Sequence, residues 1–176
     1  MSPEDLDDDI EQKLGGQPNY MTLASYNALQ AEALALLDVE RPEFTRLVHW
    51  AASNGDRSEN ADYQYGKKRL REIDRRVGYI QRRLKTAVVI DPAAQTQRER
   101  VFFGATVGYV LPDGIDKTVT IVGMDEADVQ SNKVSFISPI ARALLGKRVG
   151  DEGVLHLPAG KVVVEVDAIC YPMPRH

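Results

Sequence analysis

Two long stretches of helical periodicity joined by a short turn constrain the fold of this chain more than any other feature. Residues 56–86 place apolar side chains largely at alternating steps of three and four, the spacing of a helix that packs along one seam against a partner. The seam residues are Tyr63, Leu70, Ile73, Val77, Ile80 and Leu84. A helix of about 30 residues is about 45 Å long, because each residue adds 1.5 Å.

Residues 20–54 supply the partner helix. Thr22 is a candidate N-cap, because its hydroxyl can accept a hydrogen bond from an unsatisfied backbone N–H. Pro42 lies inside the apolar pattern and is expected to kink or interrupt the helix just before it, since proline lacks a backbone donor. The turn at residues 53–55 contains Asn and Gly, which tolerate positive φ angles. A connection this short makes the two helices antiparallel neighbours and predicts a coiled-coil hairpin over residues 20–91.

The remaining segments differ from the hairpin in composition. Residues 1–19 are strongly acidic and then rich in Gly, which is typical of a disordered tail. Residues 92–100 are polar and are predicted to form a linker. From residue 101 to 172, short β-branched runs alternate with turn signals, which predicts a small antiparallel β domain. One short helix interrupts these strands, with Ser138 as its cap and Pro139 in its first turn. The expected fold class is therefore α+β.

Composition narrows the setting in which the chain works. Apolar residues make up 43% of the chain and charged residues 27%, with a net charge of −4, which suits a globular protein. No apolar run approaches the roughly 20 residues that cross a bilayer, and the acidic start does not resemble a secretory signal. Cys170 is the only cysteine, which excludes an internal disulfide and a cysteine-only metal site. We expect a cytoplasmic protein that makes no membrane contact.

Two acidic residues, Asp56 and Glu59, follow the turn of the hairpin. At positions i and i+3 of a helix start their carboxylates can converge, and two hard oxygen donors would hold magnesium only weakly. The same spacing also forms a capping box, in which Asp56 accepts from a backbone N–H and Glu59 reaches back to the cap. Taken alone the motif favours the cap, and the two roles are compatible.

Positive charge is concentrated on the second helix. Between residues 57 and 85 there are ten basic and four acidic residues, an excess of six positive charges. Such a stripe is typical of a surface that contacts a polyanion. The clustering of Lys67, Lys68 and Arg71 nearer the turn favours RNA. The alternative is a solvated flank with ion pairs inside the helix. The candidate pairs are Arg71–Asp74 and Glu72–Arg76.

Several long motifs resemble those of one known family, and they occur in the same order along the chain as in that family. Residues 48–63 are similar to the hairpin tip of Gre transcript-cleavage factors, and residues 67–76 resemble the GreB branch in particular. Further matches lie at residues 101–105, 138–145 and 149–151, so that the resemblance covers roughly residues 19–171. It implies an N-terminal antiparallel coiled coil followed by an FKBP-like C-terminal domain.

The resemblance also implies a function. Gre factors enter the secondary channel of bacterial RNA polymerase and stimulate cleavage at the 3′ end of backtracked nascent RNA, which rescues arrested complexes. By this resemblance Asp56 and Glu59 donate carboxylates to a second magnesium that is shared with the polymerase and held weakly or not at all by the free factor. Lys67, Lys68 and Arg71 would contact the RNA. The factor would act as a monomer, completing the active site of the polymerase without being an enzyme itself.

The resemblance also assigns the start of the short helix, Ser138 and Pro139, to docking on the polymerase, whereas the residues alone indicate a plain N-cap. Three other functions stay open. A paralogue that enters the same channel and inhibits transcription is expected to differ at the tip carboxylates. A prolyl isomerase or chaperone of FKBP type needs an aromatic-lined pocket. A simple coiled-coil interaction module leaves the acidic tip and the basic face unexplained.

Overall fold

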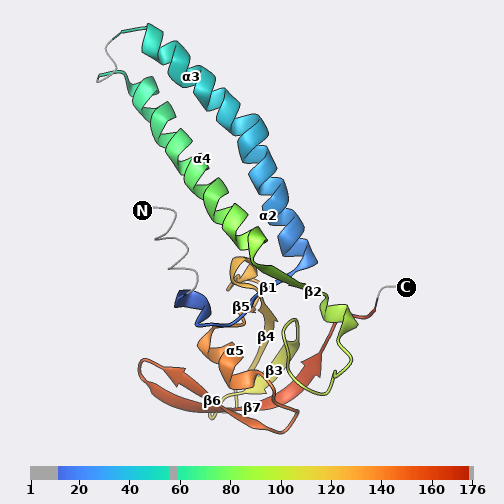
Figure 1. Cartoon of the computed structure of the whole chain (residues 1–176). Helices are drawn as coiled ribbons and strands as arrows, with labels where there is room; N and C mark the ends of the chain where they lie inside the picture. Colours follow the sequence, from blue (N-terminus) through green and yellow to red (C-terminus); the bar gives the residue numbers. More distant parts are fainter. Residues whose placement is uncertain (1–11, 56–58, 175–176) are drawn as a thin grey trace. The chain divides into compact units, whose positions relative to one another are not determined.

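The computed structural model describes residues 12–55 and 59–174 of the chain. These residues form two compact units (Figure 1). The helical unit contains residues 26–86, and the sheet unit contains residues 13–25 together with the chain from Ala87 onward. Residues 20–25 and 87–91, which the sequence assigned to the hairpin, lie in the sheet unit.

Three α-helices build the helical unit. α2 (Leu23–Ala35) continues through a π-helical segment (Leu36–Glu40) into α3 (Arg41–Ser53), and after a connection α4 (Ala61–Lys85) returns antiparallel to α3 (Figure 1). The 25 residues of α4 span about 38 Å at 1.5 Å per residue. The centre of its predicted seam is confirmed, because Ile73, Val77 and Ile80 are all buried.

Both predicted signals in the first helix are confirmed. The hydroxyl of Thr22 accepts a hydrogen bond of 3.2 Å from the backbone N–H of Ser25, which makes it the cap of α2. The same hydroxyl donates to the carboxylate of Glu126 in the sheet unit, so the start of α2 is tied down by two bonds. The expected interruption before Pro42 is the π-helical segment Leu36–Glu40, an irregularity that accommodates the missing proline donor.

Two predicted helix boundaries are wrong. The first helix was expected from residue 20, but residues 19–22 form the strand β1 (Asn19–Thr22). β1 pairs in parallel with β2 (Ala87–Ile90), in the register Asn19↔Ala87. Parallel strands need a long crossover, and the whole helical hairpin lies between these two in the sequence. No local pattern reveals such a pairing, because the partners are far apart along the chain.

The second helix was expected from residue 56, but α4 begins at Ala61. Asn60 adopts extended backbone angles, φ −86° and ψ 104°, and its side chain caps the helix. The connection between α3 and α4 therefore runs over residues 54–60, longer than the predicted turn. Residues 56–58 lie outside the described residues.

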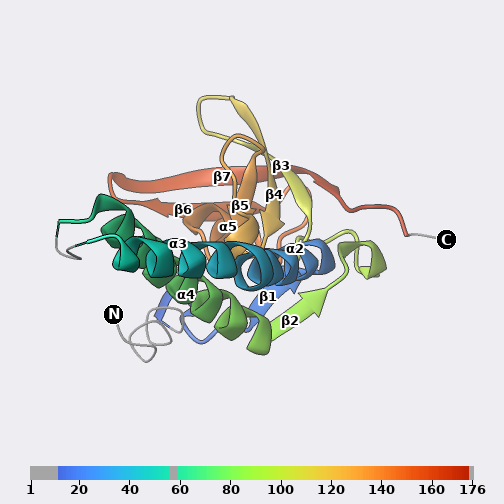
Figure 2. The ribbon, with the colours of Figure 1, turned by 90° about the horizontal axis from the view of Figure 1, so that it is seen from above.

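The sheet unit is built on a five-stranded sheet in the order β5-β4-β3-β7-β6. All neighbours are antiparallel except β4 and β5, which run parallel over three residue pairs. Figures 1 and 2 show β7 as a long curved strand beside β6. The strands are β3 (Thr106–Val110), β4 (Asp116–Val122), β5 (Lys133–Ser135), β6 (Glu152–Leu157) and β7 (Gly160–Cys170). The predicted α+β class, a helical hairpin followed by a small β domain with one short helix, is confirmed.

The short helix α5 (Pro139–Leu144) packs closely on β6. A Cβ atom placed on Gly153 would lie 2.1 Å from the carbonyl oxygen of Ala143, so only glycine permits this approach. The predicted cap of α5 is confirmed, since the Ser138 hydroxyl accepts a hydrogen bond of 3.3 Å from the N–H of Ala141. Val101 to Phe103, one of the β-branched runs in the sequence, is not a strand.

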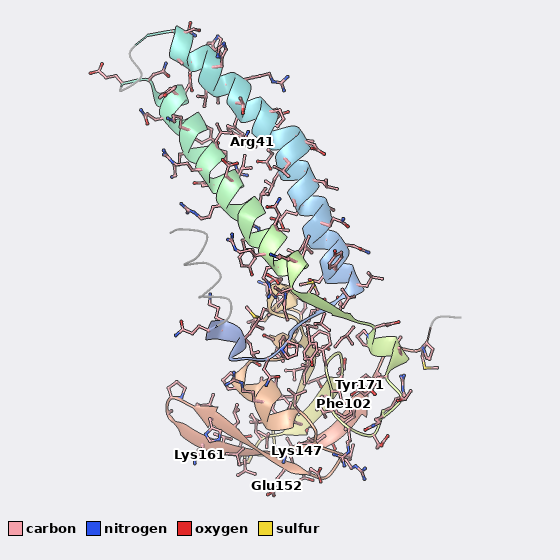
Figure 3. The ribbon with its side chains drawn as sticks, in the orientation of Figure 1. Arg41, Phe102, Lys147, Glu152, Lys161 and Tyr171 are labelled. Atoms are coloured by element: carbon pink, nitrogen blue, oxygen red, sulfur yellow. The ribbon has the colours of Figure 1, made fainter. Side chains whose placement is uncertain are left out.

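The core of the sheet unit is apolar and largely sealed from solvent. Tyr20, Phe103 and Phe136 form an aromatic cluster with ring centroids 5.4 to 5.8 Å apart. Tyr171 is buried, and its hydroxyl accepts from the N–H of Phe102 at 2.8 Å and donates to the carbonyl of Arg100 at 2.6 Å (Figure 3). Most aromatic side chains of this unit therefore pack in its core.

Candidate functional site at the hairpin tip

The connection between α3 and α4 is held by the side-chain amide of Asn60. Its Oδ1 accepts a hydrogen bond of 3.1 Å from the N–H of Tyr63, in the first turn of α4. Its Nδ2 donates a hydrogen bond of 2.8 Å to the carbonyl of Ala51, in the last turn of α3. The same carbonyl also accepts from the N–H of Asn54 at 3.1 Å. One side chain therefore binds a backbone N–H at the start of α4 and a backbone carbonyl at the end of α3.

The predicted acidic residue Glu59 lies directly before this cap and is exposed. It makes no hydrogen bond or ion pair with another residue of the described ranges. Glu59 is not the third residue of a helix, as the capping-box alternative required, because α4 starts two residues after it and takes its cap from Asn60. Its predicted partner Asp56 lies outside the described residues.

The tip has few possible metal ligands. Within residues 12–55 and 59–174, no group of three or more His, Cys, Asp or Glu side chains could hold a metal ion. Carboxylate oxygens are the ligands that magnesium prefers, but magnesium asks for six ligands in an octahedral arrangement. The carboxylates of Glu59 and Asp56 are ligands of the kind that magnesium prefers, but two of them alone would hold it only weakly.

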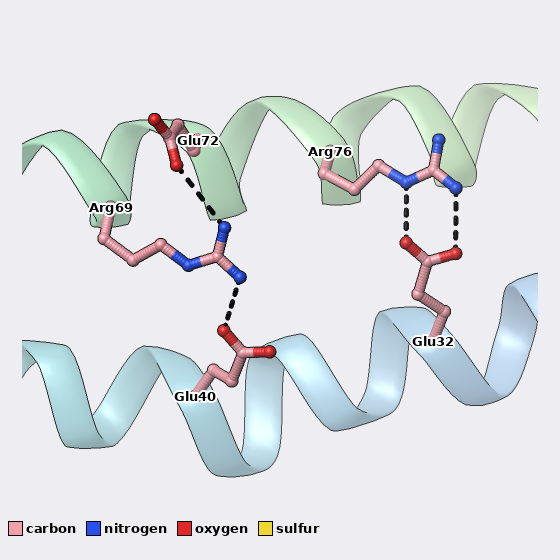
Figure 4. A network of polar contacts seen from close by, with 5 residues as sticks. All are labelled: Glu32, Glu40, Arg69, Glu72 and Arg76. Carbon is pink, nitrogen blue, oxygen red and sulfur yellow. Dashed lines mark hydrogen bonds and ion pairs between the residues drawn. The ribbon is translucent and has the colours of Figure 1, made fainter.

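The tertiary structure sorts the basic residues of α4 into two groups. Arg69 and Arg76 reach across the hairpin to acidic residues (Figure 4). Arg76 binds both carboxylate oxygens of Glu32, at 2.6 and 2.8 Å. Arg69 lies 2.6 Å from Glu40 and 3.4 Å from Glu72. The hydrogen bond to Glu40, followed by the one to Glu72, raises the pKa of Arg69 above its usual value.

A third pair joins the first residue of α3 to α4. The Nε of Arg41 lies 2.9 Å from a carboxylate oxygen of Asp74, and this hydrogen bond raises the pKa of the arginine. Neither of the two candidate pairs inside α4 forms. Asp74 pairs with Arg41 in place of Arg71, and Arg76 pairs with Glu32 in place of Glu72.

The second group contains the predicted RNA-binding residues. Lys67, Lys68 and Arg71 are all exposed on α4. Lys67 lies over the ring of Tyr63, with its Nζ 5.5 Å from the centroid. Neither Lys68 nor Arg71 makes an ion pair or hydrogen bond within the part of the chain that the structure describes. Their charges are available to a ligand, whereas those of Arg69 and Arg76 are partly neutralised.

Comparison with known proteins decides the family. The family described as "Transcription elongation factor, N-terminal" matches residues 19–89 of this chain. The family described as "Transcription elongation factor, GreA/GreB, C-term" matches residues 95–171. The chain is 52% identical to the transcription elongation factor GreB of Neisseria meningitidis serogroup B over 153 residues, which cover 87% of this chain and 94% of that protein. It is 48% identical to the GreB of Pseudomonas putida, with the same two shares. This chain belongs to the GreA/GreB family of transcription elongation factors.

The relatives also confirm the resemblance to the GreB branch, since proteins between 44% and 52% identical to this chain carry that name. Among solved structures, the GreA factor homolog 1 of Thermus thermophilus is 27% identical and matches 88% of this chain and 99% of its own. The TM-score of this match is 0.40. No helix in the described ranges of this GreA/GreB family member is long and apolar enough to span a membrane.

The other predicted site residues of this GreA/GreB family member lie in the sheet unit. Ser138 is half-buried and Pro139 is exposed at the start of α5. The hydroxyl of Ser138 is occupied by the cap, so the surface offered at this point is mainly the proline ring. Neither residue belongs to the tip, and the structure does not bring them together with Glu59 in one unit.

Some aromatic residues near the tip are partly buried on the seam, and others are exposed. Tyr63 is half-buried on the seam, as expected. Tyr65 is exposed by 60%, and its ring packs edge-on against Phe44 with centroids 5.8 Å apart. Trp50 is exposed by 56%.

Two tip residues were missed by the sequence reasoning. Asn60 had a usable signal, because Asn is among the best N-cap residues and precedes the first residues of the apolar seam. Gly66 is buried in α4, and a Cβ atom there would lie 2.6 Å from Cγ2 of Val48 on α3. Its role had no local signal, since it depends on how closely two helices approach.

Proposed function

We propose that this chain enters the secondary channel of bacterial RNA polymerase and stimulates hydrolysis of backtracked nascent RNA at its 3′ end. The observation that carries the proposal is the position of Glu59, an exposed carboxylate at the end of a two-helix stem, three residues after Asp56 in a member of the GreA/GreB family. A stem of two helices is narrow enough to deliver side chains into a channel. Membership in a family of transcription elongation factors supports the polymerase as partner.

The tip carboxylates would contribute ligands to a metal that the polymerase also holds. Magnesium bound there would act as a Lewis acid and lower the pKa of a coordinated water. The role of this chain is to bring Glu59 and Asp56 to that position, because two oxygen donors complete an existing site more readily than they form a new one. The factor then works as a monomer and has no hydrolytic activity without the polymerase.

The exposed basic residues of the stem would hold the displaced RNA. Lys67, Lys68 and Arg71 lie within three turns of the cap at Asn60, on the helix that leads away from the tip. Their ammonium and guanidinium groups suit phosphate oxygens, and Lys68 and Arg71 are not engaged by described acidic residues. RNA extruded past the tip would meet these charges first.

Docking of the sheet unit would add affinity. The exposed ring of Pro139 and the start of α5 around Ser138 form the surface that we assign to the channel rim. An isomerase function is less well supported, because Phe103, Tyr109 and Phe136 are buried in the core and do not line an open surface. A peptide isomerisation assay tests that alternative directly.

The decisive experiment uses a halted, backtracked elongation complex with magnesium. Added wild-type protein should shorten the RNA from its 3′ end, and the double variant Asp56→Asn, Glu59→Gln should lose this effect while still competing with wild type for the polymerase. Amides keep the size of the side chains and lose the charged oxygens that magnesium prefers. The matched control is Asp38→Asn, Glu43→Gln, which removes two exposed carboxylates from the stem.

The outcomes separate the possible functions. Undiminished cleavage by the folded double variant would contradict the metal-ligand role of the tip. Tight binding of wild-type protein without cleavage would indicate an inhibitor of the same channel. Absence of binding would contradict the proposal as a whole.

The RNA contact has its own test. The triple variant Lys67→Gln, Lys68→Gln, Arg71→Gln should crosslink less to the 3′ RNA, and the salt dependence of RNA binding should flatten by about 0.7 in log–log slope per lost phosphate contact. Neutralising three exposed basic residues of the sheet unit is the control for net charge. These are Lys117, Arg148 and Lys161. Equal crosslinking by both triple variants would remove the RNA assignment.

A further inference from the structure

Asn60 connects the two helix ends from which the tip is built. The last four carbonyls of α3 and the first four N–H groups of α4 have no partner inside their own helices. The Asn60 amide satisfies one group of each kind, with bonds of 2.8 Å to the Ala51 carbonyl and 3.1 Å from the Tyr63 N–H. The orientation of the amide follows from its neighbours, since a carbonyl can only accept and an N–H can only donate.

This bridge spans the whole connection between the helices. Ala51 is completely buried, so the bond from Asn60 ends on a fixed point in the seam. The carbonyl of Asn60 also accepts from the N–H of Gln64 at 3.0 Å, the first bond of α4. Side chain and backbone of Asn60 are thus held by both helices, and Glu59 is joined to it by a single peptide bond.

We infer that Asn60 is a positioning residue, which sets the direction of the Glu59 carboxylate by clamping the start of α4 to the end of α3. The inference rests on the proposed function and adds to it a residue that does not itself touch metal or RNA. Displacements of about 1 Å at a reacting centre can cost on the order of 100-fold in rate. Loss of the clamp should therefore lower the cleavage rate at saturating factor more than it lowers the affinity for polymerase.

Substitutions at position 60 can separate the two bonds. Asn60→Asp and Asn60→Ser keep a side-chain oxygen that accepts from the Tyr63 N–H, so α4 remains capped. Aspartate has no N–H to donate, and the serine side chain is too short to reach from the cap to Ala51. Asn60→Ala loses both bonds. The matched control is Asn54→Asp, the same chemical change at an exposed amide in the same connection.

Three measurements test the clamp. In the backtracked-complex assay, Asn60→Asp and Asn60→Ser should reduce the cleavage rate at saturating factor by about 10-fold or more, with an unchanged half-saturating concentration of factor and unchanged helicity. Asn54→Asp should behave as wild type. In the free protein, the Nδ2 protons of Asn60 should exchange with water far more slowly than those of Asn54, as observed by NMR.

Each result bears on one proposal. Cleavage by Asn60→Asp at the wild-type rate, or equally fast exchange of the two side-chain amides, would overturn the clamp. A lower affinity for polymerase with an unchanged maximal rate would also overturn it, because that result indicates a purely structural cap. Absence of cleavage by wild-type protein would contradict the proposed function, while the exchange measurement would still decide whether the clamp exists.

Discussion

The helical hairpin and the sheet unit are stabilised in different ways. The sheet unit buries a core from several strands and a helix, including Val107, Ile121, Leu144 and Val164, which are sealed from solvent. The hairpin has a single seam, and the ion pairs that join its helices are partly exposed. A long two-helix element cannot enclose its side chains, because each helix has only one neighbour.

This difference fits the separate roles proposed for the two units, in which the hairpin contacts metal and RNA and the sheet unit docks on the polymerase. Most side chains of the hairpin face water, so its charges can contact a ligand without a cost of opening the fold. The sheet unit keeps most of its aromatic residues inside. We expect substitutions in the sheet core to affect folding and substitutions on the hairpin surface to affect function, and four predictions test this contrast.

The largest effect is expected in the sheet core. Leu144→Ala removes a fully buried side chain of α5 and should destabilise the sheet unit by about 2 to 5 kcal/mol, since a cavity adds to the lost burial. Amide hydrogen exchange should accelerate in β3, β4 and β7 and change much less in α4. Equal acceleration in both units would show that they unfold as one, and the contrast between them would fail.

A smaller effect is expected at Tyr171 in the sheet unit. Tyr171→Phe leaves the N–H of Phe102 and the carbonyl of Arg100 without their partner, which costs about 1 to 3 kcal/mol. Burial raises the pKa of Tyr171 above its ordinary value of 10.0. The associated stability is therefore complete below pH 10 and is lost as the pH rises through the higher pKa of the folded state.

Denaturation curves between pH 8 and pH 12 check this prediction. Wild-type protein should lose sheet stability at the alkaline end, and Tyr171→Phe should show a shallower loss. Tyr109, whose pKa is also raised by burial, should account for part of the loss that remains. A wild-type stability that does not change over this range would contradict the burial of these hydroxyls.

Two glycines of α4 form a matched pair within the hairpin. Gly66→Ala should destabilise the hairpin by about 1 kcal/mol net, because the new Cβ would lie 2.6 Å from Val48 and the overlap outweighs the gain in helix propensity. Gly78→Ala meets only Arg82, at 3.4 Å, and should stabilise by up to about 1 kcal/mol. Fluorescence of Trp50, the single tryptophan, reports unfolding of this unit. Equal effects of the two substitutions would exclude close packing at Gly66.

The smallest effect is expected for an ion pair on the hairpin. A double-mutant cycle with Glu32→Gln and Arg76→Gln should give a coupling energy of about 0.2 to 1 kcal/mol, because both groups remain partly exposed. The coupling should fall as salt is raised toward 1 M. A larger coupling energy that does not respond to salt would mean that the hairpin depends on buried ion pairs. The hairpin would then not differ from the sheet unit in having exposed contacts.

Local patterns in the sequence were sufficient for most of the secondary structure. The steps between Ile73, Val77 and Ile80 identify a helix seam, because burial of one face requires that spacing. Thr22 and Ser138 are confirmed as caps, and they could be predicted because the capping bond itself joins residues only two or three positions apart. The β-branched runs from β3 to β7 were equally visible, although the sequence showed neither the parallel pairing of β4 with β5 nor the strand order.

Contacts between segments that are distant in the sequence could be identified only from the tertiary structure. β1 and β2 pair across the entire hairpin, and no local pattern records such a partner. Charge content alone did not separate Arg69 and Arg76, which are paired, from Arg71, which is exposed and without a described partner. That sorting depends on the register of α4 against α2 and α3. Sequence periodicity reflects which face of an element is buried, whereas the choice of partner across that face is made when the elements pack.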